Sequence, residues 1–298
     1  MVKVAIAGGT GAVGRALVDT IAAHPIHKAV ILSRQVNYHD VQNLVDVLVK
    51  HQIHTVICAF GITGTSLKIS QMNLIKAAAL AAPACRFIPT SYSIDYPRDG
   101  VKILPPLRDY FDCLDELDRT DLEWSVVLNG LFLDYYGTPH LKTYLPPNAF
   151  IIDMLHNAAA IPGTGDEPVS FTYTFDVAKF LVAALDLHTW PRELRVVGDE
   201  MSINDLVRRA EATKGVRFEK TYDSVAKLKR FEITELPQHR SLYTKFPKER
   251  FQWFQSIFEM WVVEGKAHVQ LHGSLNENFP DLKPLKVEGM LERCWKRS

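Results

Sequence analysis

Short apolar runs alternate with helical patterns along the first half of the chain. Residues 2–7 form an apolar run that predicts a strand, and residues 15–22 follow with apolar positions at helical spacing. Further apolar runs, each expected to be a strand, lie at 29–32, 54–60, 86–89 and 122–129. A short strand at 36–38 and helices at 40–50 and 66–82 complete the pattern. Strands that alternate with helices in this way predict a parallel, doubly wound sheet.

The second half is less regular. We expect a helix at 175–187 and a short strand at 195–198, both belonging to the first sheet, and a helix at 204–213 capped by Ser202. Residues 250–264 form a strongly apolar helix that either fills a core or lines a pocket for a large apolar molecule.

The fold class predicted from these patterns is α/β. It combines a doubly wound parallel sheet of the Rossmann, NAD(P)-binding type with a smaller, mainly α C-terminal substrate domain. We expect the dinucleotide domain to comprise residues 1–133 plus about 169–199. The substrate domain would comprise about 134–168 plus 200–298.

A glycine-rich turn separates the first strand from the first helix. Glycines at this place allow a tight turn and let the backbone approach a pyrophosphate at the helix N-terminus. The residues expected to contact the dinucleotide here are Gly8, Thr10, Gly11, Ala12, Val13 and Gly14.

The end of the second strand indicates which dinucleotide is bound. An acidic residue at this point usually holds a free ribose 2′-hydroxyl, whereas this chain has Ser33 and Arg34. A guanidinium can pair with a 2′-phosphate, so we predict NADP(H). Phe60, Gly61 and Asn129 follow later strands and are expected beside the same cofactor.

Composition excludes several classes of function. The 298 residues include 34 Lys+Arg and 34 Asp+Glu, so net charge gives no reason to expect a nucleic acid or an anionic membrane partner. No apolar run approaches the roughly 18 residues of a membrane span. The four cysteines form no CxxC pair and indicate free thiols in a reducing compartment. We expect a cytoplasmic protein without a metal site.

The chain resembles the NmrA-like branch of the atypical short-chain dehydrogenases, a branch that includes isoflavone reductase-like proteins. Within this branch it most resembles the fungal secondary-metabolism type. The resemblance runs from residue 2 to about 295. The matching stretches are VKVAIAGGTGAVG, IHTVICAF, RFIPTSYSIDY, LEWSVVLNGLFLDYYG, IPGTGDEPVSFTYTFDVAKFLVAALDL, VVGDEMSINDL and LNENFPDLKP. It implies an NADP(H) domain, a small hydrophobic substrate in the cleft beside it, and a monomer or homodimer.

The resemblance also implies a catalytic lysine on the helix between the fifth and sixth strands. Counted back from Ser125, that position falls on Tyr110, and the nearest lysine is Lys102 in a preceding loop. Tyr110 and Asp112 are therefore candidate acids on the helix at 107–118. A free tyrosine has a pKa near 10 and needs a nearby cation to act as an acid-base near neutral pH.

The fifth strand departs from the family pattern as well. Where relatives usually carry a Pro-Ser-Glu-Phe-Gly-like run, residues 89–94 read Pro-Thr-Ser-Tyr-Ser-Ile. Ser91 and Tyr92 are candidates to orient a substrate carbonyl.

Three functions remain open at this stage. The first is an NADPH-dependent reductase that acts on a hydrophobic aromatic or polycyclic secondary-metabolite intermediate, with the lysine replaced. The second is an NADP(H)-binding enzyme of net non-redox isomerisation, cyclisation or rearrangement, in which Asp95, Asp109 or Asp112 is the acid or base. The third is a non-catalytic NADP(H)-sensing regulator.

Overall fold

A five-stranded parallel sheet forms the centre of the protein. The computed structural model describes residues 1–33, 35–62, 64–82 and 84–296. Its strand order is β2-β1-β3-β4-β5, and every neighbouring pair is parallel. The strands are β1 (Lys3–Ala7), β2 (Lys28–Leu32), β3 (Thr55–Cys58), β4 (Arg86–Ile88) and β5 (Glu123–Trp124). The predicted α/β class with a parallel sheet is confirmed.

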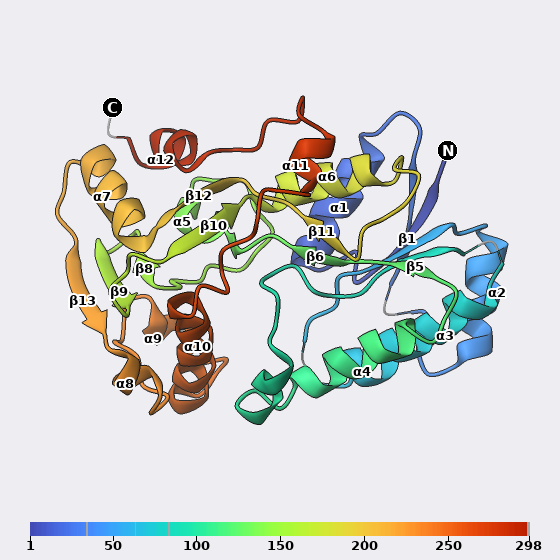
Figure 1. Ribbon diagram of the computed structural model, residues 1–298, viewed down its shortest axis with the longest axis horizontal. Coiled ribbons are helices and arrows are strands. Elements are labelled where there is room, and N and C mark those ends of the chain that lie inside the picture. The colour runs from blue at the N-terminus through green and yellow to red at the C-terminus, as the bar shows by residue number, and fades with distance from the viewer. Residues whose placement is uncertain (34, 63, 83, 297–298) are drawn as a thin grey trace.

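Helices cover both faces of this sheet (Figure 1). One face carries α1 and α6, which pack together, and the other carries α2, α3 and α4. Their bounds are α1 (Ala12–Ala22), α2 (Val41–Lys50), α3 (Met72–Leu80), α4 (Leu107–Leu117) and α6 (Thr174–Ala184), with a π-helical turn η1 (Ser66–Gln71) before α3 and a 3₁₀ turn η2 (Arg98–Lys102) before α4. All four residues of β3 are buried, as expected for a strand covered on both sides.

Smaller sheets continue from the end of the central one. β6 (Val126–Leu128) follows β5 directly and pairs in parallel with β11 (Glu193–Arg195). β10 (Pro168–Thr172) lies between β7 (Leu131–Phe132) and β12 (Asp199–Ser202).

A second group of elements lies beside the central sheet, at the left of Figure 1, and we call it the cap lobe. It contains a three-stranded sheet in the order β13-β9-β8, with α7, α8, α9, α10 and α12 around it. The strands are β8 (Ile152–Asp153), β9 (Ala158–Pro162) and β13 (Glu219–Asp223). The helices are α7 (Ile203–Lys214), α8 (Val225–Leu228), α9 (His239–Leu242), α10 (Lys248–Val263) and α12 (Val287–Trp295); α5 (Asp134–Gly137) and α11 (Leu275–Asn278) are single turns elsewhere.

Several helices begin or end at the residues that local capping signals predict. The Asp40 carboxylate accepts a hydrogen bond from the Asn43 amide and begins α2. The predicted cap at Ser202 is confirmed, because its hydroxyl accepts from the Asp205 amide at 3.1 Å. Gly215 ends α7 with a φ of +63°, in the left-handed region that glycine adopts most easily.

The strand predicted at 36–38 is wrong. The amide of Val36 turns back to the carbonyl of Ser33, and the Tyr38 hydroxyl donates to the carbonyl of Leu32. These contacts fold the segment into a turn at the end of β2, so residues 55–58 form the third strand of the sheet and not the fourth. The short strand predicted at 195–198 lies at 193–195 and pairs with β6, outside the five-stranded sheet.

Within the described ranges no helix has both the length and the apolar character needed to cross a membrane. The longest, α10, instead packs against β9 and α8 within the cap lobe.

Helix α10 carries a buried carboxyl group. Glu259 is only 2% exposed, and its Oε2 atom has no hydrogen-bond partner in the described part of the chain. Burial, assisted by the charge of Asp223 and opposed by that of Lys227, raises the pKa of Glu259 well above its usual value. The folded protein therefore binds a proton here that the unfolded chain releases above about pH 4.5.

This group makes stability depend on pH. Protonation of Glu259 contributes favourably to the free energy of unfolding. This contribution is complete below the pKa of the unfolded state, and it is lost as the pH rises toward the raised pKa of the folded state. We expect Glu259→Gln to raise the melting temperature at pH 8 and to change it little at pH 5. For a chain of this size, each kcal/mol relieved corresponds to about 2–4 °C. Glu249→Gln, at an exposed position of the same helix, is the control; an equal gain at both pH values for Glu259→Gln would contradict the prediction.

Candidate functional site

The glycine turn after β1 holds its backbone unusually close together. Gly8 has a φ of +79°, and its carbonyl accepts a hydrogen bond from the Gly11 amide at 2.9 Å. A Cβ atom on Gly14 would lie 2.2 Å from that same carbonyl oxygen. Only glycine allows α1 to start this near to β1.

The N-terminus of α1 is available to an anion. Gly11 occupies the N-cap position and supplies no side-chain hydrogen bond to the first turn. Thr10 and Gly11 are exposed, and Ala12 and Val13 are partly exposed. Free backbone amides at a helix N-terminus attract a phosphate, so this turn fits the pyrophosphate of a dinucleotide.

Other predicted cofactor residues follow the carboxyl ends of the neighbouring strands. Ser33 is half-buried and its hydroxyl accepts from the Gln35 amide; Arg34 lies outside the described residues. The Phe60 amide donates to the Thr90 hydroxyl at 3.0 Å, which ties the ends of β3 and β4 together. Gly61 is exposed next to Phe60. Ser33, Phe60 and Gly61 thus follow strands at the edge where ligands bind in such sheets.

Asn129 stands at the end of β6 with an unsatisfied oxygen. Its side chain is fully buried, its Nδ2 donates to the Gly130 carbonyl, and its Oδ1 has no partner among the described residues. The amides of Asn129 and Gly130 both donate to the carbonyl of Ser93, at 3.0 and 3.1 Å. The segment after β4 is thereby fixed beside the end of β6.

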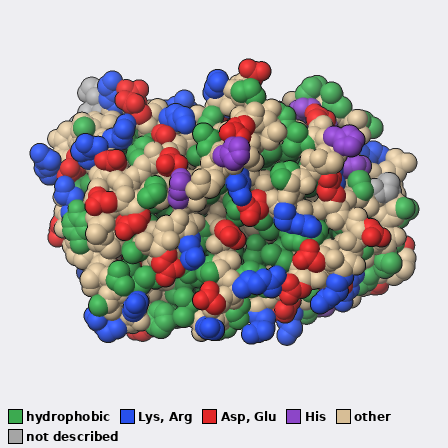
Figure 2. All heavy atoms as spheres, in the orientation of Figure 1, with side chains coloured by type: hydrophobic (Ala, Val, Ile, Leu, Met, Phe, Trp, Pro, Cys, Tyr) green, Lys and Arg blue, Asp and Glu red, His purple; other side chains and the backbone are tan. Residues whose placement is uncertain are grey.

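Four aromatic rings meet between the central sheet and the cap lobe, and we call them the aromatic box. Tyr96 lies 5.4 Å from Tyr110 of α4, 6.2 Å from Phe258 and 5.8 Å from Trp261 of α10, measured between ring centroids. Figure 2 shows hydrophobic side chains gathered on the surface between the two parts of the molecule, with charged residues around them. The box therefore offers an apolar wall to a ligand at this edge.

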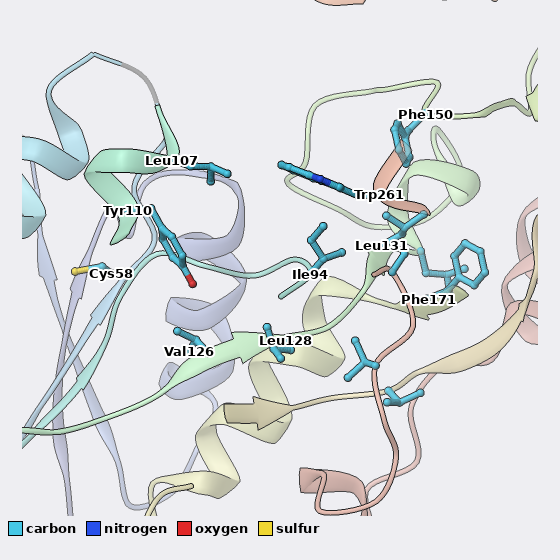
Figure 3. Close-up of a cluster of buried hydrophobic side chains, with 14 of the residues drawn as sticks. Cys58, Ile94, Leu107, Tyr110, Val126, Leu128, Leu131, Phe150, Phe171 and Trp261 are labelled. Carbon is cyan, nitrogen blue, oxygen red and sulfur yellow. The ribbon is translucent and has the colours of Figure 1, made fainter. Parts of the chain in front are cut away.

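Tyr110 belongs to this box. Its ring is buried in the first half of α4, and Figure 3 shows its hydroxyl directed toward Val126 and Leu128 of β6. Burial raises the pKa of this hydroxyl, and the neighbouring charge of Tyr96 raises it further. Tyr110 therefore stays protonated through the neutral range and can act as a hydrogen-bond donor.

The other predicted catalytic residues are placed differently. The Ser91 hydroxyl accepts from the Val127 amide at 2.8 Å, and the Tyr92 hydroxyl donates to the Cys58 carbonyl at 2.9 Å. Asp112 is exposed to solvent on α4. The hydroxyls of Ser91 and Tyr92 thus hold the backbone of neighbouring strands, and only Tyr110 of the four lies in the aromatic box.

Lys102 is the lysine nearest in sequence to the position where the family carries its catalytic lysine. It is exposed at the end of η2. It lines a pocket of about 240 Å³ that also includes Trp261, Glu264 and Lys266. Lys102 is thus close to the outer side of the aromatic box.

Sequence patterns alone did not single out Tyr96 or Ser93. Both lie in the irregular segment after β4, where periodicity carries no information. One sequence signal could have pointed to this segment. Polar residues and tyrosines stand there in place of the glutamate–phenylalanine–glycine run of the family.

The fold and the site together define a Rossmann-type protein whose ligand edge is covered by a second lobe. A search of protein-family models found no match. The chain is 32% identical to oxidoreductase BOA1 of Botryotinia fuckeliana over 95% of its own length and 96% of that protein. It is 29% identical to oxidoreductase swnN of Metarhizium robertsii, over 99% and 98% of the two chains. The fold matches the structure of AtPrR2 with NADP⁺ and (+)pinoresinol, with a TM-score of 0.72 at 19% identity over 98% of both chains.

The chain therefore belongs to the isoflavone reductase-like, NmrA-like family, as the sequence resemblance implied. It is an enzyme of the oxidoreductase class, like the relatives that it matches along almost its whole length.

The close approach in the glycine turn predicts that alanine substitutions at two helical glycines change the melting temperature differently. We expect Gly14→Ala to lower the melting temperature, because the new methyl group would overlap the Gly8 carbonyl. Gly289→Ala in α12 is the control, since its Cβ would meet only an ordinary contact at 3.5 Å and alanine favours a helix. Thermal unfolding of both variants measures the difference. If Gly14→Ala melted at the wild-type temperature, the close approach would not constrain the turn.

Proposed function

We propose that the protein is an NADPH-dependent reductase that acts on a hydrophobic aromatic or polycyclic small molecule. The observation that carries this proposal is the combination of an anion-binding turn at the N-terminus of α1 with an aromatic box at the same edge of the sheet. The full-length similarity to named oxidoreductases supports it.

The residues that would hold the dinucleotide lie at the ends of β1, β2, β3 and β6. The first turn of α1 would bind the pyrophosphate through the backbone amides of residues 12–14. Ser33 and Arg34 would contact the 2′-phosphate. Phe60, Gly61 and Asn129 would lie closer to the reactive ring, where the Oδ1 of Asn129, which has no partner among the described residues, offers an acceptor.

Tyr110 is proposed as the proton donor in place of the family's lysine. When bound, NADPH would supply a hydride to the substrate carbon. The carbon–oxygen double bond becomes a single bond, and its oxygen takes the proton of the Tyr110 hydroxyl and is left as an alcohol. Solvent then returns a proton to the tyrosinate. The raised pKa makes Tyr110 a weaker acid than a free tyrosine, but an alkoxide is a still stronger base than tyrosinate, so the proton moves to the substrate oxygen.

The surrounding chain would keep water away from this step. The buried side chains of Leu107, Val126 and Leu128 lie around Tyr110 in Figure 3. Trp261 faces them from α10. A low-dielectric surrounding strengthens the hydrogen bond between the phenol and the developing oxyanion.

A net non-redox rearrangement is the second candidate, since no lysine lies between Lys102 and Ser125. Asp95 has only part of the property that this candidate needs, because its side chain is exposed to solvent although the pKa of its carboxyl group is raised. Burial and the charge of Glu193 raise the pKa of its carboxyl group, against Lys266 and Arg195. Incubation with NADPH and a trial substrate separates the two candidates. Loss of the reduced-nicotinamide absorbance in step with product indicates reduction, and product without that loss indicates rearrangement. Dinucleotide binding without turnover of any substrate in a broad panel would instead favour the third possibility, a non-catalytic NADP(H)-sensing regulator.

The 2′-phosphate assignment predicts a selective loss of affinity. We expect Arg34→Ala to weaken NADPH binding about tenfold or more, the value of a charge-assisted hydrogen bond, and NADH binding hardly at all. Isothermal titration with both dinucleotides measures the two changes. Equal losses for NADPH and NADH would rule out the assignment.

The proton-donor assignment predicts a loss of turnover alone. We expect Tyr110→Phe to lower NADPH oxidation about 10²-fold with the aromatic carbonyl isatin as probe, and to leave the Kd for NADPH unchanged. Tyr222→Phe removes an exposed hydroxyl on β13 and serves as the control. Wild-type turnover by the Tyr110 variant would exclude Tyr110 as the donor.

A further inference from the structure

A buried hydroxyl group stands at the carboxyl end of β4, close to the glycine turn. Thr90 is only 6% exposed and follows the last residue of β4 by two positions. Its Oγ1 atom accepts a hydrogen bond from the Phe60 amide at 3.0 Å, and its own amide donates to the side-chain Oε1 of Gln71 at 2.8 Å. One bond from the end of β3 and one from η1 therefore fix both the side chain and the backbone of Thr90.

The residue that holds the Thr90 backbone is itself firmly placed. Gln71 is fully buried and ends η1, whose π-helical geometry is rare and is frequently found at functional sites. Burial of an amide costs free energy unless the amide is hydrogen-bonded, and the acceptor atom of this one is used to fix Thr90. The end of β4 is therefore held from η1 as well as from β3.

The Thr90 hydroxyl has a proton that the described part of the chain does not use. A threonine hydroxyl can donate one hydrogen bond and accept two. The Phe60 amide occupies one acceptor position of Oγ1, and no described residue accepts the proton. The neighbouring Ser91 differs, because its hydroxyl accepts the Val127 amide and donates to the Pro89 carbonyl at 3.5 Å. Thr90 is thus the hydroxyl of this segment that keeps a donor for a ligand.

Thr90 lies next to the turn that is expected to bind the pyrophosphate. A Cβ atom on Gly8 would be 3.1 Å from the Phe60 nitrogen, so the first glycine of that turn packs directly on the residue whose amide donates to Thr90. Contacts therefore run without a gap from the end of β1, through the end of β3, to the hydroxyl at the end of β4.

The strand order indicates which half of a dinucleotide passes this hydroxyl. The order is β2-β1-β3-β4-β5, and the residues expected at the 2′-phosphate, Ser33 and Arg34, follow β2 in the sequence. The pyrophosphate turn follows β1, one strand further along the edge. A dinucleotide that lies across the carboxyl edge continues over β3 toward β4. Its nicotinamide riboside half is therefore the half nearest to Thr90.

We propose that the Thr90 hydroxyl donates a hydrogen bond to an oxygen atom of the nicotinamide riboside half of NADP(H). The ribose hydroxyls and the carboxamide oxygen are the acceptors that this half offers. The inference rests on the proposed function, because it takes the dinucleotide as the ligand of this edge. Thr90 binds and orients the cofactor and transfers no proton, so its role is the same in a reduction and in a rearrangement.

Two ligands, NADPH and 2′,5′-ADP, test the proposal by isothermal titration. 2′,5′-ADP carries the adenosine and both of its phosphates but lacks the nicotinamide half. Thr90→Val keeps the shape of the side chain and removes the hydroxyl. We expect this variant to bind NADPH about fivefold to tenfold more weakly than the wild type, the usual effect of losing one hydrogen bond, with the Kd for 2′,5′-ADP unchanged. Thr90→Ser keeps the hydroxyl and should bind NADPH as the wild type does.

Thr55→Val is the matched control. Thr55 is fully buried at the first position of β3, at the opposite edge of the sheet, and its hydroxyl is hydrogen-bonded to the His54 ring at 2.8 Å. The same substitution there also removes a buried hydroxyl and its bond, but it leaves the ligand edge untouched. We expect both Kd values to match those of the wild type. Melting temperatures establish that each variant is folded.

Three results would contradict the proposal. Equal losses for NADPH and 2′,5′-ADP in Thr90→Val would mean that the unpaired Phe60 amide disturbs the glycine turn, and that no bond to the nicotinamide half is lost. Wild-type affinity for NADPH in Thr90→Val would mean that the hydroxyl makes no bond to the cofactor. A loss in Thr90→Ser as large as that in Thr90→Val would mean that the methyl group, and not the hydroxyl, supports binding.

The wild-type titrations separate the failure of this inference from that of the proposed function. If the wild type binds NADPH and Thr90→Val binds it equally well, only the role of Thr90 fails. If the wild type binds neither NADPH nor 2′,5′-ADP, the dinucleotide is not the ligand of this edge, and the proposed function and this inference are both overturned.

Discussion

The contact between the Gly14 backbone and the Gly8 carbonyl sets the geometry on which the ligand edge depends. It lets α1 begin directly beside the end of β1, with its first amides facing outward. A side chain at Gly14 would move the helix away from the sheet and its N-terminus away from an approaching phosphate. The ends of β3, β4 and β6 then place Phe60, Thr90 and Asn129 along the same edge.

The substrate side of the site depends on a different kind of contact. Tyr96 comes from the irregular segment after β4 and Tyr110 from α4, whereas Phe258 and Trp261 come from α10 in the cap lobe. Their edge-to-face and tilted packing holds the two parts together, and it surrounds phenol hydroxyls with apolar groups. Burial of this kind keeps tyrosine protonated, which suits a hydrogen-bond donor better than a base. A protonated phenol therefore fits a reduction in which the substrate oxygen gains negative charge.

Much of the architecture could be predicted because local signals were strong. The glycine turn, the alternation of apolar strands with helices and the Ser202 cap each depend on a few neighbouring residues, and each appears in the structure. The segment at 36–38 was misjudged because three residues carry too little periodicity to distinguish a strand from a turn. Residues 122–129 form two strands that pair with different partners, which is a property of the sheet and not of the segment.

The sequence by itself determined the family, the α/β class and the turn suited to a dinucleotide, because these follow from local residue types and their order. Only the tertiary structure decided which hydroxyls are free to act. Tyr92 and Ser91 have their hydroxyls bonded to the backbone, while the segment after β4 brings Tyr96 against Tyr110 and α10. Tyr96 and Trp261 are far apart in sequence, and their contact arises from burying apolar surface between two lobes, which no local pattern encodes.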